Sequence, residues 1–473
     1  MRTHESKLRD EVVGWLEQCD ARSLFELRSD AVGQGGNLLT IEQDSERCSE
    51  YLSYGLPREK FSQGRASSDR VFWFPNGVPD GAATLVASSR IGSQPDCKPE
   101  VFDAIRTLAY RFDTENRFLV THDTMATHRF ISRAAELFDL PIVELRPFPA
   151  ELDADWFLKA REELTGFVCY YDRKQDEWEG SFQVDRFVVS LAREVRLLEV
   201  RKHGNVHKAI SDRLEQSEGE TSVFLLADGR LNSSNVTEPL TELGAVPWFL
   251  YREDLGKPVD TAADAAVETM KTDSIIRLET FAESITLDDF LIHWTRRRKG
   301  PWPDQSENRY LDDLILGTFS AKHDRLRVLA RILATKRLIA TNQLTRDRKP
   351  VVCFSEVTVD RIGALRQFRA HLGRWDFETV GIAIRRSVVE RCGGRKVVYG
   401  EESDWIDLPE IDRPYFQKQK SGAIDWTAEQ EWRVVGDFGL SRLGTDDAFV
   451  FVDSEIDAGQ IASLCNWPVV VIE

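Results

Sequence analysis

The sequence lacks the features of a membrane, secreted or disulfide-bonded protein. No apolar run approaches the roughly 20 residues of a membrane span, and the first seven residues, MRTHESK, lack the apolar core of a signal peptide. The seven cysteines are dispersed and form no CxxC pair, which favours reduced thiols over a disulfide framework or a zinc site. We therefore expect a cytoplasmic protein with no membrane partner and no bound metal.

Length and composition indicate a folded protein of more than one domain. A chain of 473 residues is too long for one core. Hydrophobic residues make up 42% and aromatic residues 10% of the chain, which excludes a disordered or collagen-like protein. The formal net charge of −17 opposes general association with nucleic acid or anionic lipid.

Short apolar runs alternate with helical periodicity in the first half, which predicts a parallel sheet covered by helices. Ligands of such sheets bind beyond the carboxyl ends of the strands. The loops that we expect there are 88–92, 121–124 and 201–205. The predicted strands are 83–88, 117–120, 142–145, 195–200, 223–227 and 248–251, and the predicted helices are 101–110, 130–137, 185–192 and one opening at 204–205, with an aromatic-rich connection at 156–178.

Three short motifs in this half are Ser89-Arg90 after the first strand, Asp185-Arg186…Leu191 in a helix, and His203-Gly204-Asn205 in a turn. Their order resembles the SLOG superfamily of Rossmann-like domains, which includes DNA-processing protein A. The resemblance implies a nucleotide ligand, although the sequence has no GxGxxG turn. The candidate ligand-loop residues are Ser89, Arg90, Thr121, Asp123, Gly204 and Asn205.

Two structural alternatives remain open for these residues. Ser, Thr, Asp and Asn at such positions also cap helices without binding any ligand. His203 and His207 are four residues apart, but no third ligand or HExxH motif accompanies them. We therefore favour surface histidines over a metal site.

Composition places domain boundaries along the chain. Residues 252–275 are polar and alanine-rich and show no strand pattern, which is typical of a linker. We predict an N-terminal extension at 1–75, a SLOG-like domain at 76–251, this linker, and a second domain at 276–473. The expected folds are an α/β Rossmann-like domain with a parallel sheet, followed by an α+β domain.

The charge reverses at the start of the second domain. Residues 290–349 contain 14 Lys or Arg and 6 Asp or Glu, a local net charge of +8. A solvated helix face is the ordinary explanation, whereas a basic wall that binds phosphates is the functional one.

This region also contains a suggestive order of motifs: His293-Trp294-Thr295, then Ile332-Leu333, Phe354-Ser355 and finally Glu431. The order resembles the His-type ADP-ribosyltransferase fold. Cys353 occupies the position of the family's usual tyrosine, and Tyr399 is the candidate replacement. The segments Cys353-Phe354-Ser355-Glu356 and Glu429-Gln430-Glu431-Trp432-Arg433 also resemble bacterial abortive-infection proteins.

The resemblance implies that NAD is the substrate. Glu431 would stabilise the ribose cation and His293 would hold a ribose hydroxyl. Thr295 or Ser355 would contact the carboxamide and Phe354 would stack on the nicotinamide. Further NAD-binding candidates are Arg296, Tyr399 and Glu429.

Each of these residues has a structural alternative. His293 follows three apolar residues and suits a core position, and Glu431 beside Arg433 suits an ordinary ion pair. Enzyme activity is therefore left open.

The combined hypothesis is a bacterial conflict or anti-phage defence protein with a nucleotide-sensing domain and an NAD-consuming effector. Nucleic acid or protein would accept the ADP-ribose, and homo-oligomerisation is left open. The alternatives are a non-catalytic nucleotide-binding sensor or antitoxin-like partner, and a nucleic-acid-processing protein.

Overall fold

The computed structural model describes residues 37–40, 71–74, 81–92, 94–147, 167–171, 181–216, 222–250, 275–342, 345–369, 374–375, 377–421 and 424–472. Most of the predicted extension (1–75) and nearly all of the predicted linker (252–275) lie outside these residues. The chain divides into two compact units. Unit 1 comprises Met1–Pro258 with Glu307–Ala321, and unit 2 comprises Val259–Ser306 with Lys322–Glu473. The segment 307–321 thus belongs to unit 1, although it lies within the range 276–473.

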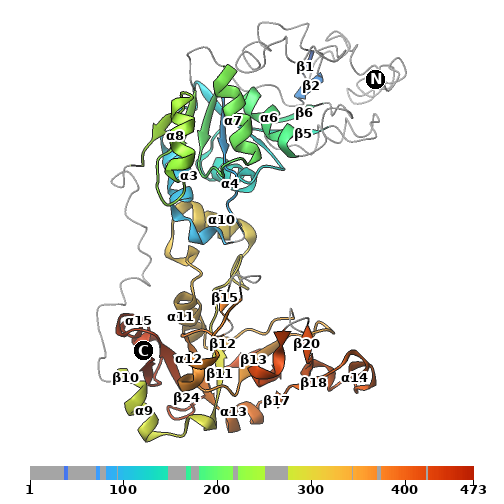
Figure 1. Cartoon of the computed structure of the whole chain (residues 1–473), viewed down its shortest axis with the longest axis vertical. Coiled ribbons are helices and arrows are strands. Elements are labelled where there is room, and N and C mark those ends of the chain that lie inside the picture. The colour runs from blue at the N-terminus through green and yellow to red at the C-terminus, as the bar shows by residue number, and fades with distance from the viewer. Residues whose placement is uncertain are drawn as a thin grey trace, which may run out of the picture. The chain divides into compact units, whose positions relative to one another are not determined.

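Unit 1 contains a parallel sheet with helices on both faces (Figure 1). Its described strands are β1 (Asn37–Thr40), β2 (Val71–Phe74), β3 (Ala82–Ala87), β4 (Arg117–His122), β5 (Ile142–Pro147), β6 (Phe167–Tyr171), β7 (Glu194–Leu197), β8 (Val223–Leu226) and β9 (Val246–Trp248). Its described α-helices are α3 (Pro99–Tyr110), α4 (His128–Phe138), α6 (Ser181–Leu191), α7 (Asn205–Gln216), α8 (Ser234–Glu242) and α10 (Glu307–Leu316).

The strand order is β1-β2-β6-β5-β4-β3-β7-β8-β9. All neighbouring strands from β6 to β9 are parallel, and β1 and β2 extend the sheet antiparallel. The predicted α/β Rossmann-like fold of the first half is therefore confirmed. β6 is an additional parallel strand within the predicted connection 156–178, where the aromatic pattern did not predict one.

Alternation along the strands assigns the two apolar cores of unit 1 to opposite faces of the sheet. Leu85, Ala87 and Val120 pack with α6, α7 and α8 on one face, whereas Val86 and Leu119 pack with α3, α4 and α10 on the other. The buried positions of α4 are Phe130, Ile131, Ala134 and Ala135, the helical spacing that the sequence predicted.

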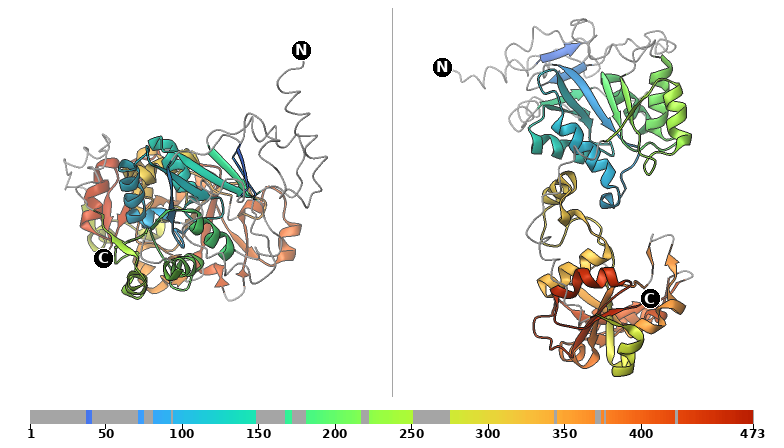
Figure 2. Two further views of the ribbon diagram at one scale, coloured as in Figure 1. Left: turned by 90° about the horizontal axis from the view of Figure 1, so that it is seen from above. Right: turned by 90° about the vertical axis from the view of Figure 1, so that its left-hand side faces the viewer.

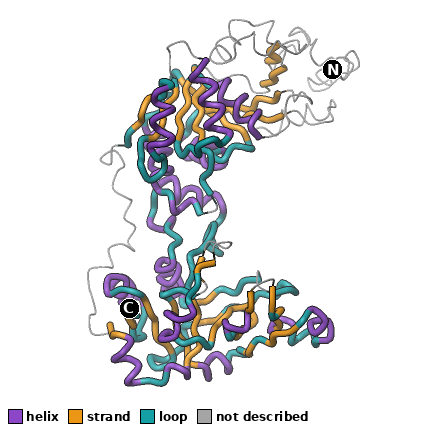
Figure 3. Tube along the Cα trace, in the orientation of Figure 1, coloured by secondary structure: helices purple, strands orange, loops and turns teal. Residues whose placement is uncertain are grey.

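Unit 2 is built on a mixed sheet with strand order β10-β25-β24-β16-β11-β13-β22-β17. Figure 3 shows its strands in orange and its helices in purple. The described strands are β10 (Ile275–Arg277), β11 (Phe290–Trp294), β12 (Arg337–Leu338), β13 (Val351–Ser355), β14 (Phe368–Arg369), β15 (Arg374–Trp375), β16 (Gly381–Arg385), β17 (Arg395–Lys396), β18 (Val398–Gly400), β19 (Phe416–Lys418), β20 (Lys420–Ser421), β21 (Ile424–Asp425), β22 (Glu431–Val435), β23 (Phe438–Gly439), β24 (Ala448–Val452) and β25 (Val469–Val471).

The described α-helices of unit 2 are α9 (Leu278–Ser284), α11 (Arg325–Thr335), α12 (Ile362–Leu365), α13 (Arg386–Arg391), α14 (Glu402–Asp407) and α15 (Glu455–Ile461). The segment 395–400 contains two strands that belong to different sheets: β17 pairs with β22 in the large sheet, and β18 pairs with β19. No helix among the described residues combines the length and the apolar character needed to cross a membrane.

Candidate functional site

The carboxyl ends of β3 and β7 form the topological switch point of unit 1. From β3 the chain proceeds through β4 to β5 on one side, and it returns to β7, β8 and β9 on the other. Loops that diverge from such a point are the usual ligand site of a doubly wound sheet. Here they are the loop 88–91 after β3 and the loop 198–204 after β7.

Hydrogen bonds join these two loops. The Ser89 amide donates to the Glu199 carbonyl at 2.7 Å, and the Ser88 hydroxyl donates to the same oxygen at 3.1 Å. The Arg201 amide in turn donates to the Ser89 hydroxyl oxygen at 2.9 Å. The predicted ligand residue Ser89 therefore braces the two loops against each other.

Two further side chains tie neighbouring elements to this edge. Lys98, the N-cap of α3, forms an ion pair with Glu199 and donates to the Arg90 carbonyl at 3.3 Å. Asn232 accepts from the Val200 amide at 2.8 Å and donates to the Leu198 carbonyl at 2.6 Å. Asn232 was not among the predicted site residues, and its position soon after the predicted strand 223–227 is the only sequence signal that marks it.

Three cationic side chains are exposed on these loops. Arg90, Arg201 and Lys202 make no side-chain hydrogen bond or ion pair within the described part of the chain. His203 follows in the left-handed region with φ of +62°, and the Gly204 amide donates to the Arg201 carbonyl at 3.0 Å to close a tight turn. α7 begins at Asn205, so Arg201 and Lys202 lie shortly before a helix N-terminus, which favours anions.

The imidazole of His203 in this turn neighbours that of His207 in α7. The rings of His203 and His207 are 6.0 Å apart. Burial and the nearby His203 and Lys202 charges lower the pKa of His207. No group of three or more potential metal ligands occurs among the residues that the structure describes.

The third predicted loop needs a correction. Thr121 lies inside β4, opposite Glu144 of β5, and its side chain is buried rather than presented in a loop. The ladder with β5 continues to His122, two residues beyond the predicted strand end. Of the two candidates Thr121 and Asp123, only Asp123 is exposed. Its carboxylate lies 2.9 Å from His122 Nδ1.

In unit 2 the strand register separates the candidate NAD-site residues. Ile292 pairs with Ser355 and Ser355 pairs with Glu431. Because paired residues share a face and neighbours along a strand alternate, Ser355 and Glu431 lie on one face of the sheet. His293 and Phe354 lie on the other, with ring centroids 5.8 Å apart.

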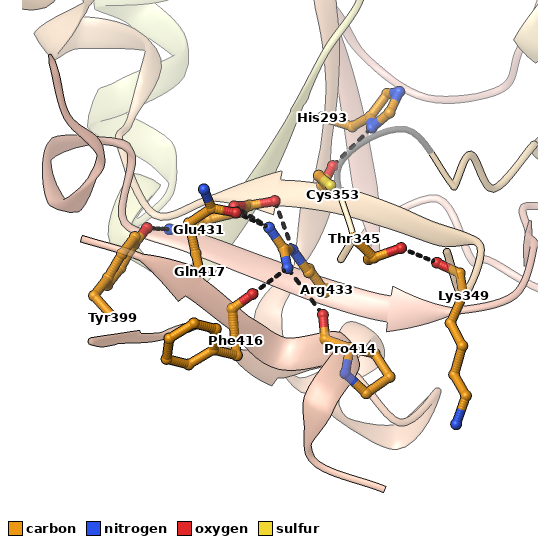
Figure 4. Close-up of polar contacts among 10 residues, drawn as sticks. All are labelled: His293, Thr345, Lys349, Cys353, Tyr399, Pro414, Phe416, Gln417, Glu431 and Arg433. Carbon is orange, nitrogen blue, oxygen red and sulfur yellow. Dashed lines mark hydrogen bonds and ion pairs between the residues drawn. The ribbon is translucent and has the colours of Figure 1, made fainter. Parts of the chain in front are cut away.

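Glu431 is held by Arg433 on its own strand (Figure 4). Arg433 Nε and Nη2 donate to the two carboxylate oxygens at 2.9 and 3.0 Å. The remaining Arg433 donors bond Gln417 Oε1 and the Pro414 and Phe416 carbonyls, each at 2.9 Å. Both charged groups are buried, so this ion pair fastens the segment 414–417 to the sheet.

The Tyr399 hydroxyl accepts from the Glu431 amide at 3.1 Å (Figure 4). This contact brings the candidate replacement tyrosine to Glu431 but not to Phe354. Burial raises the pKa of Tyr399 to about 12, which keeps the phenol protonated.

The other candidates of unit 2 contact mainly backbone groups. His293 Nδ1 donates to the Cys353 carbonyl at 2.9 Å, and burial lowers the pKa of this imidazole. The Ser355 hydroxyl donates to the Glu429 carbonyl at 2.7 Å and accepts from the Val357 amide at 3.0 Å. Thr295 is buried, and Arg296 is partly buried.

The predicted basic wall is divided. Residues 307–321 of the basic segment belong to unit 1 and the remainder to unit 2. Acidic residues also neutralise several of its cations, and all but Asp304 of these acids lie outside the segment 290–349. The ion pairs are Arg325–Asp453, Arg331–Asp304, Arg337–Asp437 and Lys349–Glu410.

Comparison with known proteins identifies no family. No family model matches the chain, and no curated protein matches it. It is similar to DNA processing protein A from Helicobacter pylori, a structure described for its single-stranded DNA binding mode, with 16% identity over 44% of this chain and 90% of that chain and a TM-score of 0.26. It is also similar to DNA processing protein A from Streptococcus pneumoniae, with 16% identity over 45% of this chain and 77% of that chain and a TM-score of 0.27.

Proposed function

We propose that this protein is a non-catalytic nucleotide sensor that binds its ligand at the switch-point edge of unit 1. The observation that carries the proposal is the set of exposed cations Arg90, Arg201 and Lys202 on the loops after β3 and β7, none of which has a side-chain partner among the described residues. A parallel sheet presents such loops at the position where ligands of this architecture bind.

Phosphate is the chemical group that this edge suits. An arginine guanidinium matches two phosphate oxygens with parallel N–H groups, and a lysine adds a compact positive charge. The N-terminus of α7 contributes partial positive charge directly after Gly204. The hydrogen bonds through Ser88 and Ser89 hold the loops before any ligand arrives, which reduces the entropy lost on binding.

Two features of unit 2 support a sensor over an NAD-cleaving enzyme. The Glu431 carboxylate is neutralised by Arg433, and the register directs His293 to the opposite face of the sheet from Glu431. NAD cleavage by unit 2 stays a prediction, tested by whether the protein converts labelled NAD and whether Glu431→Gln abolishes that conversion.

Thermal unfolding of the full chain tests the sensor proposal, with ATP, NAD, ADP-ribose and a short single-stranded oligodeoxythymidine as separate ligands. At least one nucleotide should raise the Tm, since a ligand that binds only the native state stabilises it. NAD should remain intact by chromatography. The double variant R201Q/K202Q should lose the Tm shift.

The matched control is Lys299→Gln, which removes an exposed positive charge from unit 2 and should keep the shift. The proposal fails if no nucleotide raises the Tm, or if the double variant responds as the wild type does. A shift with the oligonucleotide alone would favour nucleic-acid processing instead.

A further inference from the structure

Helix α10 packs in unit 1, although in sequence it lies between β11 and α11 of unit 2. Figure 2 shows this yellow helix beside the blue helices of unit 1. Its residues Tyr310, Leu311, Leu314 and Ile315 are buried in the core that contains the apolar faces of α3 and α4. The chain enters this helix through residues 295–306 and leaves it through 317–324, so α10 is an insertion of unit 1 between two segments of unit 2.

Two arginines fasten α10 to its neighbours. Arg133 of α4 donates to both carboxylate oxygens of Asp312, through Nε at 2.5 Å and Nη2 at 2.9 Å. Arg106 of α3 is buried and donates from Nη1 to the Ile315 carbonyl at 3.0 Å. A cation at the last carbonyls of a helix is favourable because the helix dipole is negative there.

The residue that follows α10, Gly317, lies against the guanidinium of Arg106. Gly317 has φ of +69°, and a Cβ at this position would lie 2.5 Å from Arg106 Nη1. Gly300, in the connection that leads into α10, has a similar φ of +73°, but nothing lies within 4 Å of its Cβ position. An alanine strains the backbone at both positions but collides only at 317.

The helices that hold α10 are also the helices that begin at the candidate ligand edge. Lys98, at the start of α3, pairs with Glu199. Thr127, at the start of α4, donates to the Val86 carbonyl of β3 at 2.8 Å. Phe102 and Phe130 connect α3 and α4 with ring centroids 5.2 Å apart. The loops that carry Arg90, Arg201 and Lys202 are thereby connected to α10 through two helices.

We propose that docking of α10 against α3 and α4 is coupled to nucleotide binding at the switch-point edge, so that the bound nucleotide holds α10 in the core of unit 1. This inference rests on the proposed sensor function and identifies the docking of α10 as the event that nucleotide binding controls. Coupling between two events is reciprocal. Releasing α10 must therefore weaken nucleotide binding, and nucleotide must protect α10 from opening.

Hydrogen exchange and titration of the full chain test the coupling, with ATP, NAD and ADP-ribose in separate arms. The nucleotide that binds should slow exchange of the amides in 307–316. Gly317→Ala should speed that exchange and weaken binding of the same nucleotide about fivefold or more. Gly300→Ala, the matched control, should change neither. Asp312→Ala should act like Gly317→Ala without altering the backbone.

The outcomes separate the two proposals. If the wild type binds a nucleotide and both variants speed exchange in 307–316 yet bind with unchanged affinity, the coupling is refuted and the sensor function stands. The coupling is also refuted if neither variant speeds exchange. If the wild type binds none of the nucleotides, both proposals fail.

Discussion

At the scale of single residues, the clearest assignment is the role of Arg433. Its five N–H donors are all used, two of them by Glu431 and the others by Gln417, Pro414 and Phe416. Burial opposes its charge, yet the adjacent Glu431 carboxylate raises the pKa of Arg433 above its usual value. The pair therefore stabilises a folded segment, and it neutralises the Glu431 charge that an NAD-cleaving site would direct at a substrate cation.

The first prediction follows from this pair. Glu431→Gln leaves the buried Arg433 charge without its counterion, which should lower the free energy of unfolding by about 3–5 kcal/mol. Glu410→Gln breaks an exposed pair with Lys349 and should cost at most about 1 kcal/mol. Urea unfolding of both variants measures the difference. Equal stabilities would show that Glu431 is not a structural anchor.

The second prediction concerns Asp185 of α6. Burial raises its pKa from 3.8 to about 6. Because its pKa is raised in the folded state, Asp185 stays protonated in the folded protein at pH values where it ionises in the unfolded chain. The resulting loss of folding stability is absent below about pH 4 and grows until pH exceeds about 6. Asp185→Asn should remove that decline, by less than about 3 kcal/mol because the side chain is partly exposed.

Thermal unfolding between pH 4 and pH 8 gives the comparison for Asp185. The wild-type Tm should fall relative to that of Asp185→Asn as pH rises through this window. Parallel Tm profiles for the two proteins would contradict the raised pKa.

At the scale of elements, local sequence patterns predicted features that depend on one segment alone, such as a strand or the buried face of a helix. The predicted strand 83–88 corresponds to β3 (Ala82–Ala87), and the spacing of Phe130, Ile131 and Ala134 corresponds to the buried face of α4, because burial and periodicity are properties of one segment. The positions of His293 and Glu431 depend on the register of β11, β13 and β22, where a shift of one residue exchanges the faces. No short motif contains that information.

α10 illustrates the same limit for helices. Its apolar positions 310, 311, 314 and 315 identify a buried face, but periodicity does not identify the partner. The partner is a pair of helices about 200 residues earlier, as the separation of 209 between Arg106 and Ile315 shows. Domain boundaries drawn from composition cannot detect an inserted helix of this kind.

The third prediction tests the joint between β7 and β8. Asn232 donates to the Leu198 and Leu226 carbonyls and accepts from the Val200 amide. Asn232→Ala leaves these buried backbone groups without partners and should lower the free energy of unfolding by about 2–3 kcal/mol. Asn235→Ala, an exposed neighbour, should change it little. Urea unfolding distinguishes the two, and equal loss in both variants would contradict the role of Asn232.

At the scale of the whole molecule, charge acts over two distances. The chain carries −17 overall, whereas the candidate edge presents Arg90, Arg201 and Lys202. At low salt the Debye length is about 30 Å, so charges over most of the molecule repel an approaching anion. At physiological salt the Debye length is about 8 Å, so only charges near the anion act on it. The attraction of an anion to the cationic edge is therefore greatest, relative to the repulsion by the rest of the molecule, when the distant charges are screened.

The fourth prediction uses this difference and rests on the sensor proposal. The association rate constant of ATP should rise as ionic strength increases from about 0.01 M to about 0.15 M, because screening removes the long-range repulsion first. NAD carries less negative charge than ATP and should show a smaller rise. Stopped-flow binding measures both rates. If the rates fall with salt, the cations at the edge dominate even at long range, and the overall charge of −17 does not govern the encounter.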